Sequence, residues 1–153
     1  MSALTKESLK KYASDNRGTF ETLLREFVEL PTVSVDPTQR DTIREAAKVA
    51  CATIRRFGGE PSIVETDGHP IVHGRWGNDP SRPTVTIYNH LDVQPASKET
   101  EPWETEPFVF TQKGDRYFGR GTTDDKGPAL AALLGAQAAL DAGVPANLRV
   151  LWE

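Results

Sequence analysis

The sequence lacks the features that define three broad classes of protein. A single cysteine, Cys51, occurs among the 153 residues, which excludes a framework of intramolecular disulfides. No apolar run approaches the length of a membrane-spanning helix, and the start, MSALTKESLKKYASDN, has no apolar core of signal-peptide length. The formal net charge of −4 disfavours binding to nucleic acid or to an anionic membrane. These absences predict a cytoplasmic protein with neither nucleic acid nor membrane as a partner.

The composition that remains is typical of one globular domain with a core. Hydrophobic residues make up 37% of the chain and charged residues 26%. Apolar residues at helical spacing predict a helix over residues 19–30, which Pro31 ends, and a second over 41–57, which Gly58 and Gly59 end. The predicted buried faces consist of Phe20, Leu23, Leu24, Phe27 and Val28 in the first helix, and Ile43, Ala46, Ala50, Ile54 and Phe57 in the second.

Strand patterns dominate the rest of the chain. Short strands are predicted at 62–66 and 70–76, a buried strand at 84–90, and a hairpin over 108–121 that turns at residues 113–115. A helix over 128–142 then precedes a strand at 147–153. A helix between two apolar strands indicates a crossover connection, so we expect an α/β fold.

The stretch TIYNHLDVQP places His90 and Asp92 at the end of the predicted buried strand. Residues two apart in a strand point to the same side, so both can face one site. An imidazole is a common transition-metal ligand, and a carboxylate on its other nitrogen fixes its orientation. The alternative to a metal ligand is a surface histidine with an acidic residue nearby.

The stretch GRGTTDDKGP places two adjacent acids, Asp124 and Asp125, just before the predicted 128–142 helix. Gly119 and Gly121 permit a close approach of the backbone. A carboxylate held at such a turn can bridge two metal ions. In the alternative reading, Asp125 caps the helix and Asp124 is solvated. An anion site is disfavoured because two acids repel phosphate and the Walker pattern is absent.

HLDVQP, WETEPF and GRGTTDDKGP occur in this order, and together they resemble the co-catalytic zinc peptidase family. That family includes aminoacylases, acetylornithine deacetylases, succinyl-diaminopimelate desuccinylases, glutamate carboxypeptidases and carnosinase-like dipeptidases. The stretches HLDVQP and GRGTTDDKGP are most similar to the cytosolic dipeptidase branch. The resemblance is most specific over residues 85–134. It implies that residues 1–153 are the N-terminal portion of an α/β/α catalytic domain with a mixed central sheet.

The resemblance also implies roles for individual residues. His90 matches a zinc ligand, Asp92 the catalytic acid that orients it, and Asp124 the carboxylate that bridges two zinc ions, for which manganese or cobalt can substitute. Asp125 matches no ligand, but the Asp124–Asp125 peptide bond is a candidate for the cis form. Because both ligands must reach one metal, we expect His90 at the end of a central strand, with its side chain within roughly 3–6 Å of Asp124.

The same resemblance implies that parts of the full enzyme lie outside this chain. The family's catalytic Glu-Glu pair would follow Glu153, and the lid domain that forms the homodimer is absent. We therefore expect the parent protein to hydrolyse dipeptides and the 153-residue chain to be inactive alone. Two alternatives stay open: an N-acyl amino acid deacylase of the same family, such as a deacetylase or desuccinylase, and a non-catalytic remnant or interaction module.

The other polar and aromatic residues receive structural interpretations. His69 and His73, on a turn and a strand, are not expected to bind catalytic metal. Trp103 and Phe108 are expected to pack a loop over the sheet. The basic residues Arg120 and Lys126 are expected to balance the local acids.

Overall fold

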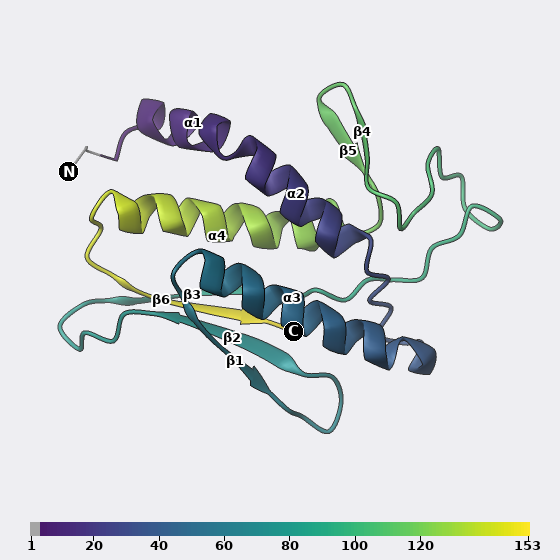
Figure 1. Ribbon diagram of the computed structural model, residues 1–153, viewed down its shortest axis with the longest axis horizontal. Helices are drawn as coiled ribbons and strands as arrows, with labels where there is room; N and C mark the ends of the chain where they lie inside the picture. Colours follow the sequence, from purple (N-terminus) through teal and green to yellow (C-terminus); the bar gives the residue numbers. More distant parts are fainter. Residues whose placement is uncertain (1–3) are drawn as a thin grey trace.

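The fold is built on a four-stranded mixed sheet with helices packed against one face, as the computed structural model of residues 4–153 shows (Figure 1). Across the sheet the order is β1-β2-β6-β3; β1, β2 and β6 pair antiparallel, and β3 pairs parallel to β6. A separate hairpin is formed by β4 and β5. In chain order the elements are α1 (Lys6–Asp15), α2 (Arg17–Val28), the short 3₁₀ helix η1 (Pro37–Gln39), α3 (Arg40–Arg56), β1 (Glu60–Val64), β2 (Ile71–Trp76), β3 (Thr84–Asn89), β4 (Thr111–Lys113), β5 (Arg116–Phe118), α4 (Lys126–Asp141) and β6 (Asn147–Trp152).

The core lies between the sheet and the helices. Alternate residues of β6 point into it and are buried, as the period of two in a strand requires, and Trp152 meets Phe27 of α2 edge-on with ring centroids 6.0 Å apart. The helices α3 and α4 lie against the strands. The α/β class and the mixed sheet are therefore confirmed. Within residues 4–153 the helices form one layer, so the second helical layer of an α/β/α domain is not among the described residues.

Both predicted N-terminal helices are confirmed as α2 and α3, with the expected apolar faces turned inward except for half-buried Phe20 and Phe57. The predicted C-terminal helix begins two residues earlier than expected, at Lys126 rather than Pro128. Helix α1 was not predicted. None of its residues is buried, so it has no strong apolar stripe to detect, and a capping box between Thr5 and Ser8 marks its start. All helices among residues 4–153 are too short or too polar to span a lipid bilayer.

The prediction that residues 84–90 form the best-buried strand is wrong. They form β3, and β3 is an edge strand of this sheet, so His90 follows an edge strand rather than a central one. Val85 is 50% exposed and Tyr88 57% exposed. The apolar residues of β3 make it suited to packing against another element. Whether they are buried depends on whether such an element lies beside the strand.

We expect the isolated chain to self-associate through this edge. The outer side of β3 has no strand partner among the described residues, and Val85 and Tyr88, which lie on opposite faces of this strand, are exposed to solvent. Sedimentation velocity over a concentration series should show a concentration-dependent shift to larger species, and Val85→Lys should reduce it. A compact monomer at every concentration would contradict this expectation.

Candidate metal centre

The strands β3 and β6 are parallel, so their carboxyl ends meet at one edge of the sheet, where ligands of α/β folds gather. His90 follows β3 directly. Its Nδ1 lies 3.0 Å from Oδ1 of Asp92, so the two side chains meet at one site, as their spacing of two predicted. The ring's other nitrogen, Nε2, points away from Asp92 towards a second carboxylate.

That second carboxylate is Asp124, which lies in the loop between β5 and α4. Its Oδ1 is 3.0 Å from Nε2 of His90, within the expected range. The loop and the first turn of α4 each need a glycine. Gly121 has a φ of +92°, and a Cβ on Gly127 would lie 2.1 Å from the carbonyl oxygen of Thr122. The Asp124–Asp125 peptide bond is cis, as expected from the resemblance.

Asp125 occupies the N-cap position of α4, but its side chain makes no capping hydrogen bond. Its Oδ2 instead accepts hydrogen bonds from Nδ2 of Asn89, at 2.9 Å, and from the backbone N–H of His90, at 3.3 Å. The helix-capping interpretation of Asp125 is therefore right for its position and wrong for its side chain. This carboxylate ties the loop that carries Asp124 to the end of β3, and so it helps to place Asp124 beside His90.

The environment of His90 changes its proton affinity. Burial alone would lower the pKa of His90, but hydrogen bonds with Asp124 and Asp92 outweigh burial and raise it. The protonated ring therefore stabilises the fold at low pH, and that contribution is lost as the pH rises through the raised pKa. Metal binding has the opposite dependence, because it needs the lone pair on Nε2.

The donors fit a transition metal in chemistry but form only part of a site. A neutral imidazole and a carboxylate suit zinc, and the His90 and Asp124 side chains are 34% and 85% exposed, so an ion can reach both. Among residues 4–153, however, no group of three or more His, Cys, Asp and Glu side chains is placed to hold a metal ion. A closed zinc site takes four ligands, so this arrangement supplies part of one.

The other polar residues singled out in the sequence are not part of the pair formed by His90 and Asp124. Nε2 of His69 is 3.0 Å from the carbonyl oxygen of Ser34, and His73 lies within β2. The guanidinium of Arg120 lies over the ring of Trp103, 5.0 Å from its centroid, and pairs with Glu101, so its expected role beside acids holds.

Lys126 does not balance the acids by surface pairing, contrary to expectation. Its side chain is buried, and its Nζ donates hydrogen bonds to the carbonyl oxygens of Phe27 and Leu30, both at 2.8 Å. Burial lowers the pKa of Lys126 to about 7, against a smaller opposing effect of Asp92.

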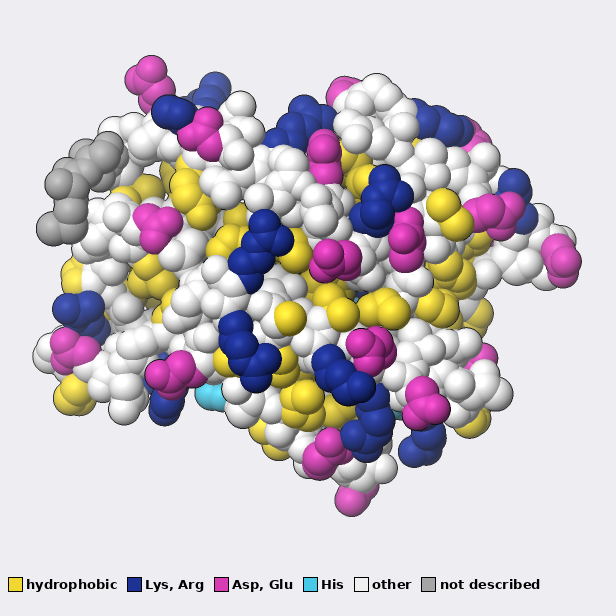
Figure 2. All heavy atoms as spheres, in the orientation of Figure 1, with side chains coloured by type: hydrophobic (Ala, Val, Ile, Leu, Met, Phe, Trp, Pro, Cys, Tyr) yellow, Lys and Arg dark blue, Asp and Glu magenta, His cyan; other side chains and the backbone are white. Residues whose placement is uncertain are grey.

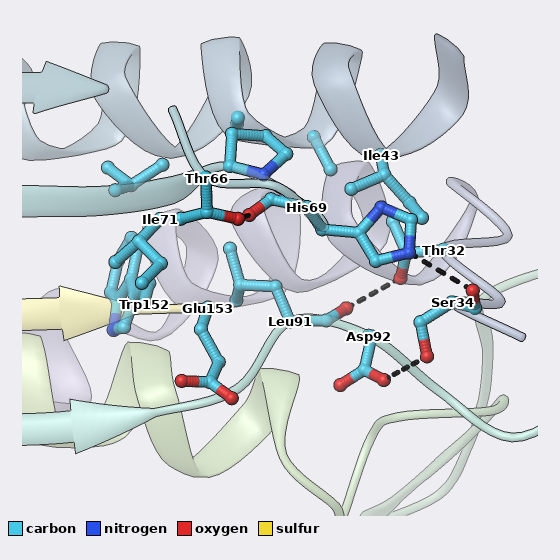
Figure 3. Close-up of a pocket in the computed structure, with 14 residues that line it drawn as sticks. Thr32, Ser34, Ile43, Thr66, His69, Ile71, Leu91, Asp92, Trp152 and Glu153 are labelled. Carbon is cyan, nitrogen blue, oxygen red and sulfur yellow. Dashed lines mark hydrogen bonds between the residues drawn. The ribbon is translucent and has the colours of Figure 1, made fainter. Parts of the chain in front are cut away.

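A cavity of about 360 Å³ adjoins the candidate metal centre, with Asp92 and Glu153 on its wall (Figure 3). Its lining shows a contact that the sequence did not reveal. The hydroxyl of Ser34 donates to Oδ2 of Asp92 at 2.5 Å. Ser34, Asn89 and Asp125 were all missed as partners of the site, and only the adjacent acids of the GRGTTDDKGP stretch hinted at one of them.

Comparison with known proteins shows which families and enzymes this chain is similar to. Residues 86–153 match the family described as Peptidase family M20/M25/M40. The chain is 38% identical over 161 residues to the Cys-Gly metallodipeptidase dug1 of Schizosaccharomyces pombe, which covers 96% of this chain and 33% of that protein. A shorter stretch, 35% of the chain, is 46% identical to a succinyl-diaminopimelate desuccinylase of Buchnera aphidicola.

Solved structures agree with the sequence matches. The di-peptidase Dug1p from Saccharomyces cerevisiae superimposes with a TM-score of 0.85 at 30% identity, covering 96% of this chain and 34% of that one. Human carnosine dipeptidase 1 superimposes with a TM-score of 0.84 at 32% identity, again covering 96% of this chain and 34% of that one. The chain thus spans about a third of the length of these three dipeptidases.

Proposed function

We propose that this chain is part of a metal-dependent dipeptidase of the M20/M25/M40 peptidase family, which residues 86–153 match, with His90 and Asp124 as metal ligands. The observation that carries the proposal is the His90 ring held between two carboxylates, with Asp92 on Nδ1 and Asp124 3.0 Å from Nε2. Zinc is the metal that this mixed nitrogen and oxygen donor set favours, and manganese or cobalt are possible substitutes.

Each residue of the site has a separate task in this proposal. Asp92 keeps the proton of His90 on Nδ1, which leaves Nε2 free to bind. Asp124 has two oxygens on an exposed carboxylate and can bridge two ions. When bound, such ions supply Lewis acidity and lower the pKa of water, which is the chemistry that amide hydrolysis needs.

A dipeptide is the substrate class that the comparisons favour over an N-acyl amino acid. The metallodipeptidase dug1 matches 96% of the chain, whereas the desuccinylase matches 35%. The alternative of a non-catalytic module is disfavoured because the fold still brings His90, Asp92 and Asp124 together.

The wider assignments belong to the same proposal. Residues 1–153 form the N-terminal portion of the catalytic domain, and a lid domain outside them mediates a homodimer. A cytoplasmic location is supported by the single cysteine, Cys51, which is buried in α3. Basic and acidic side chains alternate over the face shown in Figure 2, so that face has no broad positive patch for nucleic acid.

Zinc binding to the 153-residue chain tests the ligand assignment. We expect weak binding, followed by NMR, that shifts the ring signals of His90 and is lost in His90→Ala and Asp124→Ala. Asp92→Asn should weaken the affinity by about 10- to 100-fold, because the ligand survives without its orienting charge. His73→Ala is the matched control, since His73 lies within β2. Zinc affinity that is unchanged in His90→Ala would overturn the proposal.

A further inference from the structure

The two oxygens of the Asp92 carboxylate have different partners. Oδ1 lies 3.0 Å from Nδ1 of His90, and Oδ2 accepts the hydroxyl hydrogen of Ser34 at 2.5 Å. Figure 3 shows the Ser34 hydroxyl pointing towards the Asp92 carboxylate, with both residues among those that line the cavity. With a donor on each oxygen, rotation of the carboxylate about its Cβ–Cγ bond would break one hydrogen bond or the other.

The backbone around Ser34 is itself fixed to the segment that carries Asp92. The hydroxyl of buried Thr32 donates to the carbonyl oxygen of Leu91 at 2.5 Å, and the N–H of Val93 donates to the carbonyl oxygen of Thr32 at 2.9 Å. Val33 and Val93 form a parallel bridge. The Ser34 carbonyl also lies 3.0 Å from Nε2 of His69. The Ser34 hydroxyl is therefore held in place, unlike that of a serine on a free loop.

The chemistry of a hydroxyl suits this position. A lysine or arginine there would pair with Asp92 and offset the negative charge that acts on the imidazole. A hydroxyl donates one hydrogen bond and adds no charge, so it leaves the negative charge of the carboxylate in place. Ser34 comes from the loop before η1, far from His90 in sequence, and it touches neither His90 nor Asp124 in any hydrogen bond of the described residues.

We propose that Ser34 is a positioning residue for the metal centre. Its hydroxyl fixes the Asp92 carboxylate, which holds the His90 proton on Nδ1 and leaves Nε2 available to the metal. This inference rests on the proposed function, because it gives Ser34 a role only if His90 is a ligand.

The test compares the native chain with Ser34→Ala and Ser34→Thr, which keeps the hydroxyl. Ser81→Ala is the matched control, because the Ser81 hydroxyl also donates to an aspartate, Asp79, at 2.6 Å but far from His90. Two quantities are measured: the fraction of the His90 ring protonated on Nδ1, from long-range ¹H–¹⁵N NMR at alkaline pH without metal, and the zinc dissociation constant.

In Ser34→Ala we expect the Nδ1–H fraction to fall and the zinc dissociation constant to rise by roughly 3- to 10-fold, less than for loss of Asp92 itself. Ser34→Thr should restore both, and Ser81→Ala should change neither. Native values of both quantities in Ser34→Ala, or equal changes in Ser81→Ala, would overturn the role of Ser34. If zinc affinity is instead unchanged in His90→Ala, the proposed function itself fails, so the two failures are distinguishable.

Discussion

The 153-residue chain alone is expected to release no amino acid from Cys-Gly, β-Ala-His or other dipeptides above background, with or without added zinc. Its described residues provide two candidate ligands and an orienting acid, and no group of three or more ligating side chains. Loss of a positioned general base alone costs about 10²- to 10⁴-fold in rate, and an incomplete metal site loses water activation as well.

A chimera supplies the positive control for this experiment. Residues 1–153 would replace the matching third of Schizosaccharomyces pombe dug1, and free amino acids would be detected with ninhydrin. The chimera should hydrolyse dipeptides, and Asp124→Ala within it should abolish turnover. Zinc-dependent turnover by the 153-residue chain, lost in His90→Ala, would show that the catalytic groups are misassigned.

Replacement of Lys126 by methionine is expected to change stability in a manner that depends on pH. Methionine keeps an unbranched stem but leaves the carbonyl oxygens of Phe27 and Leu30 without their donor, and an unsatisfied buried acceptor costs about 1–3 kcal/mol. The substitution also removes the free-energy cost of burying the lysine charge, which opposes this loss. The balance between the two depends on whether Lys126 is protonated.

The pKa of Lys126 is lowered from 10.5 to about 7. Between these two values the unfolded chain binds more protons than the folded chain, so the native free energy of unfolding rises with pH relative to Lys126→Met. The slope is at most about 1.4 kcal/mol per pH unit. The native chain should therefore exceed the variant most clearly at alkaline pH, where the hydrogen bonds remain and the charge is gone.

Urea unfolding at a series of pH values measures this difference. Lys48→Met is the control, because Lys48 is exposed on α3 and pairs with Glu45, so its effect should stay within about 0.5 kcal/mol at every pH. A stability difference between the native chain and Lys126→Met that does not vary with pH would contradict the lowered pKa.

Local patterns were sufficient to predict much of the fold. The helical spacing of apolar residues identified α2 and α3, and a turn at Gly114 identified the β4–β5 hairpin. The burial of β3 could not be predicted, because the exposure of Val85 and Tyr88 depends on what lies beside the strand. The N-terminal helix α1 has no buried residue and so gave no periodic signal.

The candidate site, like the fold, could be predicted only in part from the sequence. The spacing of two between His90 and Asp92 is a local relation, and it predicted that both side chains meet, although both residues follow the end of β3 at Asn89. Asp124 was assigned through the resemblance rather than through spacing. The partners Ser34 and Asn89 act on acids that are distant in the sequence, and only the folded chain shows which loop reaches which carboxylate.

The position of β6 in the sheet has a consequence for how the chain folds. Among the described residues, β6 is the strand that joins the β1–β2 hairpin to β3, pairing Val72 with Trp152 and Thr84 with Asn147. It also follows β1, β2 and β3 in the sequence, so during synthesis the two halves of the sheet emerge with no strand to connect them. Pairing over such separations closes long loops and slows folding. Ribosome-bound chains that end before Asn147 should therefore be readily cut by proteases within β2 and β3, and protection should arise only once β6 has left the exit tunnel.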